Sequence, residues 1–218
     1  FDENRNVWTV EFKDQPTLEA QFVIFSSVPL HVPQIPHIKG IEKFKGKVFH
    51  SSKWEHDYDL NGKSVASIGT GGSAIQYIPE IAPEVKQLYV FQRTAAWVIP
   101  RDERKYSQLS KTLFKASNIY RQIHRTRLYW TNESRVVPIS NKYFPTFNRK
   151  NVELVTDAIQ EITANGIITK DGKERQIDCL IYGTGFITDP RIYLKHFDCV
   201  GRNGIELKQA WKDGAESY

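Results

Sequence analysis

Six residues of this sequence, at positions 69–74, have the types and spacing of a segment that binds a dinucleotide; they read Gly-Thr-Gly-Gly-Ser-Ala. Gly69 permits a tight turn after a strand, Gly71 lets the backbone approach a pyrophosphate, and Ala74 is small enough for a helix to pack closely on a strand. A helix that starts in this segment also presents unpaired N–H groups and the positive end of its dipole to phosphate oxygens. The pattern therefore predicts a dinucleotide-binding turn, and the alternative is a tight structural turn that holds no ligand.

The residues that follow the second strand of such a unit indicate which nucleotide it holds. A site for NAD places a carboxylate there, about 20 residues after the turn, to bond the ribose hydroxyls. This sequence has Gln92-Arg93-Thr94 instead, with Arg93 24 residues after Gly69. A guanidinium can bind a 2′-phosphate through two parallel hydrogen bonds, and the Thr94 hydroxyl can add another. We therefore expect NADPH rather than NADH, and a surface arginine is the alternative interpretation of Arg93.

The segments around the turn have the patterns needed to position it. Residues 63–68 form a short apolar strand, residues 73–81 carry apolar side chains at helical spacing, and residues 87–91 form the next strand. Pro79 is unfavourable inside a helix, so the helix is expected to bend or to be near its end there. Strand, turn, helix and strand within about 30 residues make a nucleotide-binding unit.

The rest of the chain combines short strands with one long helical segment. Pro29, Pro33 and Pro36 mark an extended connector, and a domain boundary is expected there. Asn-Gly at 165–166 and Asp-Gly at 171–172 are turn signals between strands. The other predicted elements are strands at residues 7–12, 21–26, 152–155, 159–163, 166–169 and 180–182 and a helical segment at residues 106–132.

The composition is that of an ordinary globular protein, with 40% hydrophobic and 25% charged residues in a chain of 218. No run of about 18 apolar residues occurs, so no membrane span is expected. The polar start of the chain differs from a secretory signal. The chain begins at Phe1 and contains no Met, which predicts a piece of a longer open reading frame.

The cysteines and the excess of basic residues exclude some functions and leave others open. Cys179 and Cys199 lack the spacing of metal ligands, so no metal site is expected. Cys179 lies in an apolar run and is interpreted as a small core residue, a usage that fits a reducing cytoplasm. The net charge is +5, with nine Lys or Arg residues against three acidic residues between positions 101 and 135. That stretch is interpreted as a solvated helix face; the alternatives are a nucleic-acid-binding face and a general attraction for an anionic cofactor.

The segment just before the glycine turn carries a resemblance to a known family. Residues 44–54 read F-K-G-K-V-F-H-S-S-K-W. They resemble the F-x-G-x-x-x-H-x-x-x-W signature of Baeyer–Villiger monooxygenases, within the wider flavin-containing monooxygenases. Residues 91–101, 178–186 and 201–216 are similar to further segments of that family, so the resemblance covers nearly the whole chain.

The resemblance implies an enzyme with two nucleotide cofactors, NADPH and FAD. NADPH reduces FAD, and the reduced flavin uses dioxygen to insert one oxygen atom into a small-molecule ketone or a soft nitrogen or sulfur nucleophile. The implied fold is α/β, with a Rossmann-like three-layer NADP-binding domain inserted between two parts of an FAD-binding domain. By this resemblance residues 1–37 end the first FAD part, residues 38–178 are the NADP-binding domain with a helical segment at 104–133, and residues 179–218 start the returning FAD part. No nucleic-acid partner is expected, and the sequence leaves the oligomeric state open.

The resemblance also implies roles for single residues. By this resemblance the expected NADPH contacts are Gly69, Thr70, Gly71, Gly72, Ser73, Ala74, Gln76, Arg93 and Thr94. The signature histidine is His50, which is expected to act in catalysis by coupling the NADP-binding domain to the flavin site. The residues alone allow a structural histidine equally well. Trp54 is interpreted as a packing residue. Thr184 and Gly185 match a family connector and are expected to contact a cofactor.

The sequence departs from the family pattern at several places. Glu55 stands where the family usually has Pro or Asp, and residues 26–28 read Ser-Ser-Val where the first connector is Ala-Thr-Gly. Part of the family's helical segment has no counterpart, and Arg135 follows Ser134 rather than a lysine, so the family's catalytic arginine is not assigned to it. No second dinucleotide turn occurs among the 13 glycines, so the FAD turn is expected before Phe1 and the isolated chain is expected to be inactive. The alternative is a non-catalytic NADPH-binding remnant.

Overall fold

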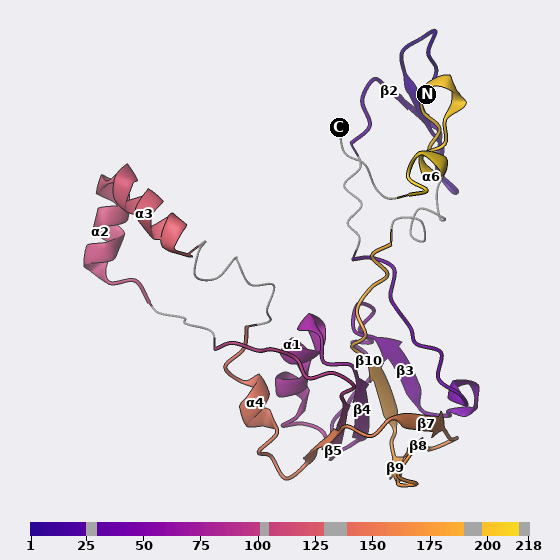
Figure 1. The fold of residues 1–218 in the computed structure, drawn as a ribbon, viewed down its shortest axis with the longest axis vertical. Coiled ribbons are helices and arrows are strands. Elements are labelled where there is room, and N and C mark those ends of the chain that lie inside the picture. The colour runs from indigo at the N-terminus through magenta and orange to yellow at the C-terminus, as the bar shows by residue number, and fades with distance from the viewer. Residues whose placement is uncertain (25–29, 101–104, 129–138, 190–197, 214–218) are drawn as a thin grey trace. The chain divides into compact units, whose positions relative to one another are not determined.

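The computed structural model describes residues 1–24, 30–100, 105–128, 139–189 and 198–213 of the chain. The chain divides into two compact units, one of residues 1–36 with 184–218 and one of residues 37–183. The larger unit, 37–183, contains the glycine turn and the strands on either side of it (Figure 1). The assignment of residue ranges to NADP-binding and FAD-binding domains stays a prediction.

The larger unit contains most of the helices and strands. In chain order these are η1 (Ile41–Lys43), β3 (Lys47–His50), β4 (Ser64–Ile68), α1 (Gly72–Ile81), β5 (Gln87–Phe91), α2 (Gln108–Ala116), α3 (Asn118–Leu128), α4 (Tyr143–Thr146), β6 (Val152–Val155), β7 (Ile159–Ile162), β8 (Gly166–Thr169), β9 (Glu174–Gln176) and β10 (Cys179–Tyr182). The predicted strands at 87–91, 152–155 and 166–169 are confirmed with the same bounds. The short β3 and β9 were not predicted from the sequence.

Five strands of the larger unit form one parallel sheet in the order β3-β10-β4-β5-β6. The central strands β4 and β10 are almost fully buried, as expected when both faces of a parallel sheet are covered. Their continuous apolar runs are the reason the sequence pattern identified them. The passage from β4 through α1 to β5 is the predicted strand, turn, helix and strand, and it is confirmed.

The two faces of the parallel sheet are covered by different kinds of element. On one face α1 buries Ile75 and Ile78 in a core that also contains one residue of β4 and alternate residues of β10. On the other face the antiparallel sheet β7-β8-β9 contributes Ile162 and Ile167 to a second core. Each such isoleucine stabilises the fold by about 1.5–3 kcal/mol when buried. The expected three-layer α/β fold is confirmed, and one of its outer layers is a sheet.

The predicted helical segment at residues 106–132 is two helices rather than one. The backbone of Ser117 is extended, with φ −129° and ψ 117°, and so ends α2. The Ser117 hydroxyl accepts the N–H of Tyr120 at 3.2 Å, while Ser107 accepts the N–H of Ser110 at 3.1 Å. Serine side chains therefore start both helices, a local competition with helix continuation that apolar spacing does not reveal. Residues 129–132 of the predicted segment lie outside the described residues.

The smaller unit is built around a two-stranded antiparallel sheet. Its elements are β1 (Trp8–Val10), β2 (Leu18–Ala20), η4 (Arg202–Gly204) and α6 (Leu207–Ala210). β1 confirms the predicted strand at 7–12, but the strand predicted at 21–26 is wrong for residues 21–24, because β1 pairs with 18–20. The apolar side chains of Phe22 and Ile24 are exposed instead of paired. Residues 25–28, which include the end of that predicted strand and the altered connector, lie outside the described residues. Arg135 lies outside them as well.

Candidate dinucleotide site

The segments that carry the predicted site meet at the carboxyl edge of the parallel sheet. Ile68, at the end of β4, is level with Tyr182 of β10 on one side and with Phe91 of β5 on the other. β4 connects to β5, on one side of it, through α1. β10, the last strand of the unit in the sequence, lies on the other side of β4. The edge next to β4 is therefore a topological switch point, the place where open α/β sheets bind ligands.

The glycine turn takes the conformation that its sequence predicts. Gly69 has a φ of +101°, in the left-handed region that a side chain would strain, and its N–H donates to the carbonyl of Phe91 at 3.1 Å. The chain then reverses so that Gly71 caps α1 and Gly72 is the first helical residue. Ala74 is completely buried beneath the turn, as its small size predicts. The sequence and the structure agree at all of these positions.

The start of α1 offers hydrogen-bond donors to an anion. The N–H groups of the first helical turn have no partner inside the helix, and no side chain caps them. The first turn contains no acidic residue, so nothing there competes with an anion for the positive end of the helix dipole. Gly71 and Gly72 are exposed, so a ligand can approach the backbone.

Two side chains of the turn hold its shape. The hydroxyl of Thr70 donates to the carbonyl of Thr94 at 3.2 Å and joins the turn to the segment after β5. The amide of Gln76 donates to the carbonyl of Gly72 at 3.0 Å. Both side chains were expected to bind the nucleotide directly; here their polar groups engage the backbone of the site itself.

Arg93 and Thr94 lie where the nucleotide argument requires them, immediately after β5. Both residues are exposed. Within the described part of the chain the Arg93 side chain forms no hydrogen bond or ion pair. Its guanidinium is therefore available to an anionic ligand at the same edge of the sheet as the turn.

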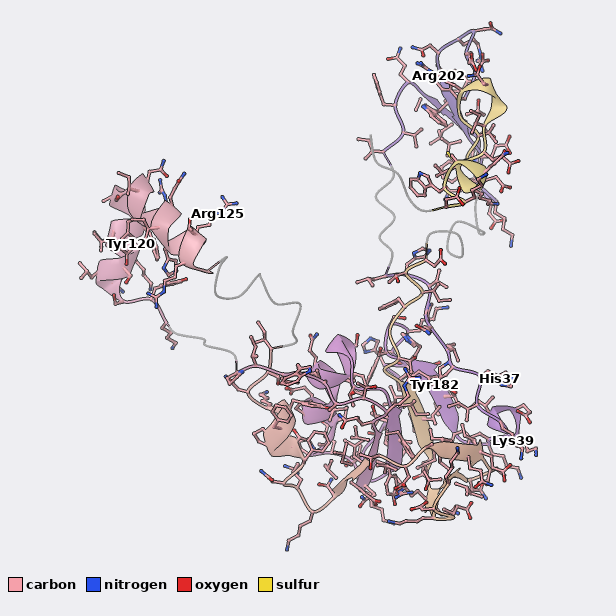
Figure 2. All side chains as sticks on the ribbon, viewed as in Figure 1. His37, Lys39, Tyr120, Arg125, Tyr182 and Arg202 are labelled. Carbon is pink, nitrogen blue, oxygen red and sulfur yellow. The ribbon has the colours of Figure 1, made fainter. Side chains whose placement is uncertain are left out.

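His50 ends β3, two strands away from β4 in the sheet order. Two strand spacings place it about 10 Å from the end of β4. It is buried, and its Nδ1 accepts the backbone N–H of Ser52 at 3.1 Å, so the proton of the neutral ring is on Nε2. Neighbouring Tyr182, labelled in Figure 2, is also buried, and burial raises the pKa of its phenol. The structure therefore brings His50 to the same edge of the sheet as the turn.

The structure also identifies a residue at this edge that sequence reasoning missed. Gly183 follows β10, and its N–H donates to the carbonyl of Ile68 at 2.8 Å. Its backbone lies against the turn, because a Cβ built on it would be 3.5 Å from the carbonyl oxygen of Gly69. Gly183 and Gly69 are far apart in the sequence, so no local pattern could have indicated this contact.

Thr184 and Gly185 belong to the smaller unit and pair with the connector there. The Thr184 hydroxyl donates to the carbonyl of Gln34, and the N–H of Gln34 donates to the carbonyl of Gly185 at 2.9 Å. Gly185 has a φ of +79°, which explains its residue type. Their expected contact with a cofactor stays a prediction.

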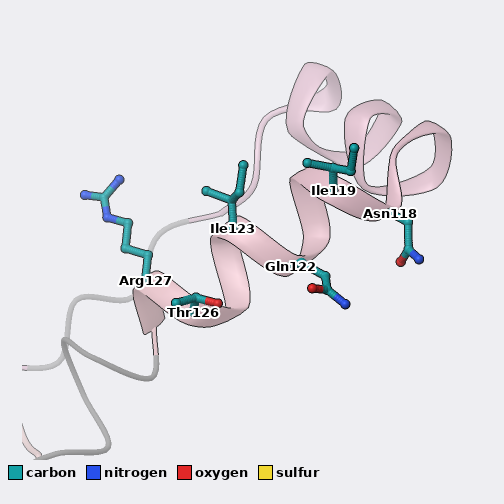
Figure 3. A pocket seen from close by; sticks show the side chains of 6 residues that line it. All are labelled: Asn118, Ile119, Gln122, Ile123, Thr126 and Arg127. Atoms are coloured by element: carbon teal, nitrogen blue, oxygen red, sulfur yellow. The ribbon is translucent and has the colours of Figure 1, made fainter.

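A separate hollow of about 710 Å³ runs along α3 (Figure 3). Ile119 and Ile123 line it with exposed apolar side chains, and Arg127 is the one charged residue of its lining. It contains no pair of acid and base, so we assign no chemistry to it. In the ranges that the structure describes, no group of three His, Cys, Asp or Glu side chains could hold a metal ion. No helix in those ranges is long and apolar enough to cross a membrane.

Comparisons with known proteins identify relatives of this chain. Residues 13–136 match the family model described as flavin-binding monooxygenase-like. The whole chain is 32% identical to a Baeyer-Villiger monooxygenase of Pseudomonas aeruginosa and 32% identical to one of Streptomyces coelicolor, of which it covers 49% and 50%. The solved structure of OTEMO in complex with FAD and NADP is similar over the whole chain and 56% of that protein, with a TM-score of 0.74 at 27% identity. An open structure of cyclohexanone monooxygenase, with a TM-score of 0.83 at 22% identity, covers 99% of this chain and 58% of that one and shows the fold.

The fold and the turn define a Rossmann-type α/β protein, in which the carboxyl edge of the parallel sheet is the candidate dinucleotide site. The chain belongs to the flavin-binding monooxygenase-like family. It spans about half the length of the curated relatives it matches. The alignment with the P. aeruginosa protein takes 262 positions for the 218 residues of this chain, so that relative has residues in the matched region without a counterpart here.

Proposed function

We propose that this chain is the NADPH-binding part of an FAD- and NADPH-dependent monooxygenase of the Baeyer–Villiger type. The observation that carries the proposal is the left-handed glycine turn that leads into an uncapped helix start, with an exposed arginine after the next strand. The relatives described as Baeyer-Villiger monooxygenases and the solved complex with FAD and NADP support it.

The turn fits the pyrophosphate of a dinucleotide. A Cβ on Gly72 would meet nothing within 4 Å, and one on Gly71 would meet only the carbonyl oxygen of Gly183, at 3.8 Å, so the space in front of the backbone is open. The N–H groups of Gly72 and Ser73 donate to the phosphate oxygens, and the helix dipole favours their charge. Arg93 and Thr94 bind the 2′-phosphate that distinguishes NADPH from NADH. When bound, NADPH supplies the hydride that reduces the flavin.

The remaining site residues receive roles through the family. His50, buried at the end of β3, is proposed to couple the NADP-binding domain to the flavin site. Thr184 and Gly185, which belong to the smaller unit, are proposed to contact a cofactor. The name of the relatives indicates a ketone as the small-molecule substrate, with dioxygen as the source of the inserted oxygen atom.

The test of the nucleotide assignment is Arg93→Ala. A charge-assisted hydrogen bond contributes about 1.5–3 kcal/mol, and exposure of Arg93 places the effect at the lower end, so affinity for NADPH should fall about tenfold. Affinity for NADH should change less than about twofold, because NADH lacks the phosphate that Arg93 binds. Titration of the protein with each nucleotide, followed by nicotinamide fluorescence, measures both.

Arg149→Ala is the matched control. Arg149 is also exposed and stands before β6, at the amino edge of the sheet. Its removal takes away the same charge and should leave both affinities unchanged. An equal loss for NADPH and NADH in Arg93→Ala would refute the 2′-phosphate contact. An equal loss in both arginine variants would mean that only the general charge matters.

A second test concerns the flavin. We propose that the 218-residue chain by itself binds NADPH without turning over substrate, because it contains one dinucleotide turn. The absorption spectrum of the purified chain should show no flavin bands while the NADPH titration saturates. Recovery of yellow, flavin-loaded protein would contradict this proposal.

A further inference from the structure

Position 183 requires a glycine because its neighbours leave no room for a side chain, not because of its backbone conformation. Its φ lies outside the left-handed region, so a side chain would not strain the backbone there. A Cβ at this position would, however, stand 2.6 Å from the hydroxyl oxygen of Tyr77 and 3.0 Å from the Cβ of Ala74. Contacts that short require a neighbour to move, and both neighbours belong to α1.

The Tyr77 side chain is held on both sides and cannot yield freely. Its hydroxyl shares a hydrogen bond of 2.7 Å with the hydroxyl of Ser67, a completely buried residue of β4. Its ring contacts that of Trp54, with 5.4 Å between the ring centres, and Trp54 in turn stands edge-on to Phe49 at 5.1 Å. Burial raises the pKa of the Tyr77 phenol, so the group stays neutral and keeps its hydrogen bond.

These contacts join three separate segments beneath the nucleotide-binding edge. Tyr77 lies three residues after Ala74 on α1, and therefore on the same face of the helix as the small residue of the turn. Gly183 directly follows β10, and Trp54 belongs to the signature segment at residues 44–54. A shift of the Tyr77 ring would move the first turn of α1 with it, because protein interiors are close-packed.

We propose that Gly183, Tyr77 and Trp54 are positioning residues for the dinucleotide turn. The missing side chain at 183 makes room for the Tyr77 hydroxyl, and the Trp54 ring holds Tyr77 from the other side. Together they set how closely the start of α1 stands to the ends of β4 and β10. The inference rests on the proposed NADPH site.

The decisive experiment is a double-mutant cycle read by NADPH affinity on the whole chain. Gly183→Ala should weaken NADPH binding about tenfold, because the overpacked Tyr77 ring displaces the first turn of α1, which would bind the pyrophosphate. Tyr77→Phe removes the oxygen that the new Cβ would meet at 2.6 Å. In that background the same glycine replacement should weaken binding only about threefold or less, since the neighbours now yield more easily.

Gly166→Ala is the matched control for general destabilisation. A Cβ on Gly166 would stand 2.7 Å from the carbonyl oxygen of Arg175, a clash of similar size, but in the outer antiparallel sheet. This variant should lower the melting temperature while NADPH affinity of the folded protein stays within about twofold of wild type. Trp54→Leu, which keeps Gly183, should weaken NADPH binding about threefold by freeing one side of the Tyr77 ring.

The outcomes separate the inference from the function on which it rests. Wild-type protein that does not bind NADPH would overturn the proposed function and the inference together. Wild-type binding with equal losses in Gly183→Ala and Gly166→Ala, or no relief from Tyr77→Phe, would overturn the inference alone. If Gly183→Ala does not fold, unchanged NADPH affinity in both Trp54→Leu and Tyr77→Phe would overturn it as well.

Discussion

Glu153→Gln is expected to destabilise the larger unit, because Glu153 neutralises a buried arginine. Arg175 of β9 is 4% exposed. Its Nε and Nη2 donate to Oε1 of Glu153 at 3.0 and 2.7 Å, and its Nη1 donates to the hydroxyl of Thr169 at 2.7 Å. Lys173 donates to the same Glu153 oxygen at 3.0 Å. The carboxylate thus ties β6 of the parallel sheet to the outer antiparallel sheet.

The magnitude follows from the burial of the two partners. Removing one member of a fully buried ion pair costs about 3–5 kcal/mol. The Glu153 side chain is 32% exposed, so solvent compensates part of the loss. We therefore expect about 2 kcal/mol, which corresponds to a fall in melting temperature of about 4–8 °C for a unit of this size. Thermal unfolding followed by far-ultraviolet circular dichroism measures it.

The same pair predicts how the effect depends on pH. Burial opposes ionisation of Glu153, but the hydrogen bonds from Arg175 and Lys173 outweigh it and lower the pKa of the carboxyl below its ordinary value. A carboxyl with a lowered pKa in the folded state contributes stability above its unfolded pKa and loses it as pH falls through the folded pKa. The difference between wild type and Glu153→Gln should therefore be full at pH 7 and shrink below about pH 4.

A control variant and a double variant test whether the loss comes from the unpaired Arg175. Glu84→Gln removes an exposed carboxylate that forms no ion pair in the described part of the chain, and it should leave the melting temperature unchanged. Glu153→Gln combined with Arg175→Met should recover part of the loss, because no buried charge then lacks a partner. A melting temperature in Glu153→Gln equal to that of wild type at pH 7, or a difference that grows on acidification, would refute the reasoning.

Two other predictions test the core of the larger unit. Cys179 is completely buried and burial raises the pKa of its thiol to about 12, so iodoacetamide at pH 8 should modify the partly exposed Cys199 and spare Cys179 until the protein is unfolded. Peptide mass spectrometry measures this, and equal modification in the folded protein would contradict it. The Asn151 amide donates to the carbonyls of Ala82 and Val85 at 2.8 and 2.9 Å, so Asn151→Ala should cost about 1–3 kcal/mol in urea unfolding. The same replacement at exposed Asn61 should cost less than about 0.5 kcal/mol, and equal costs would show that the two bonds do not matter.

Where the structure departs from expectation, long-range pairing or a local side-chain bond is the cause. Residues 21–26 are more apolar than 18–20, yet the hairpin register places 18–20 opposite β1. The helix expected at 106–132 divides at Ser117, whose hydroxyl starts a second helix. The strands β3 and β9 are short and partly polar, and neighbouring strands define them more than their own composition does.

The sequence by itself determined the glycine turn, the strand before it, the helix after it and the next strand. These features depend on local requirements: a positive φ at Gly69, a small residue at 74, and apolar spacing with period 3.6 in α1. The motif at residues 44–54 likewise indicated the family to which the chain belongs. Such requirements can be recognised in a few consecutive residues.

Only the tertiary structure decided which distant segments meet at that turn. The parallel pairing of β10 with β4 brings Gly183 against Gly69, and the packing of α1 brings Tyr77 between Trp54 and Gly183. The tertiary structure also covers the second face of the sheet with β7, β8 and β9 instead of helices. Parallel strands are joined through long crossovers, so the partners of a parallel strand lie far away in the chain. The residue type at one position of such a contact therefore does not indicate which distant residue it meets.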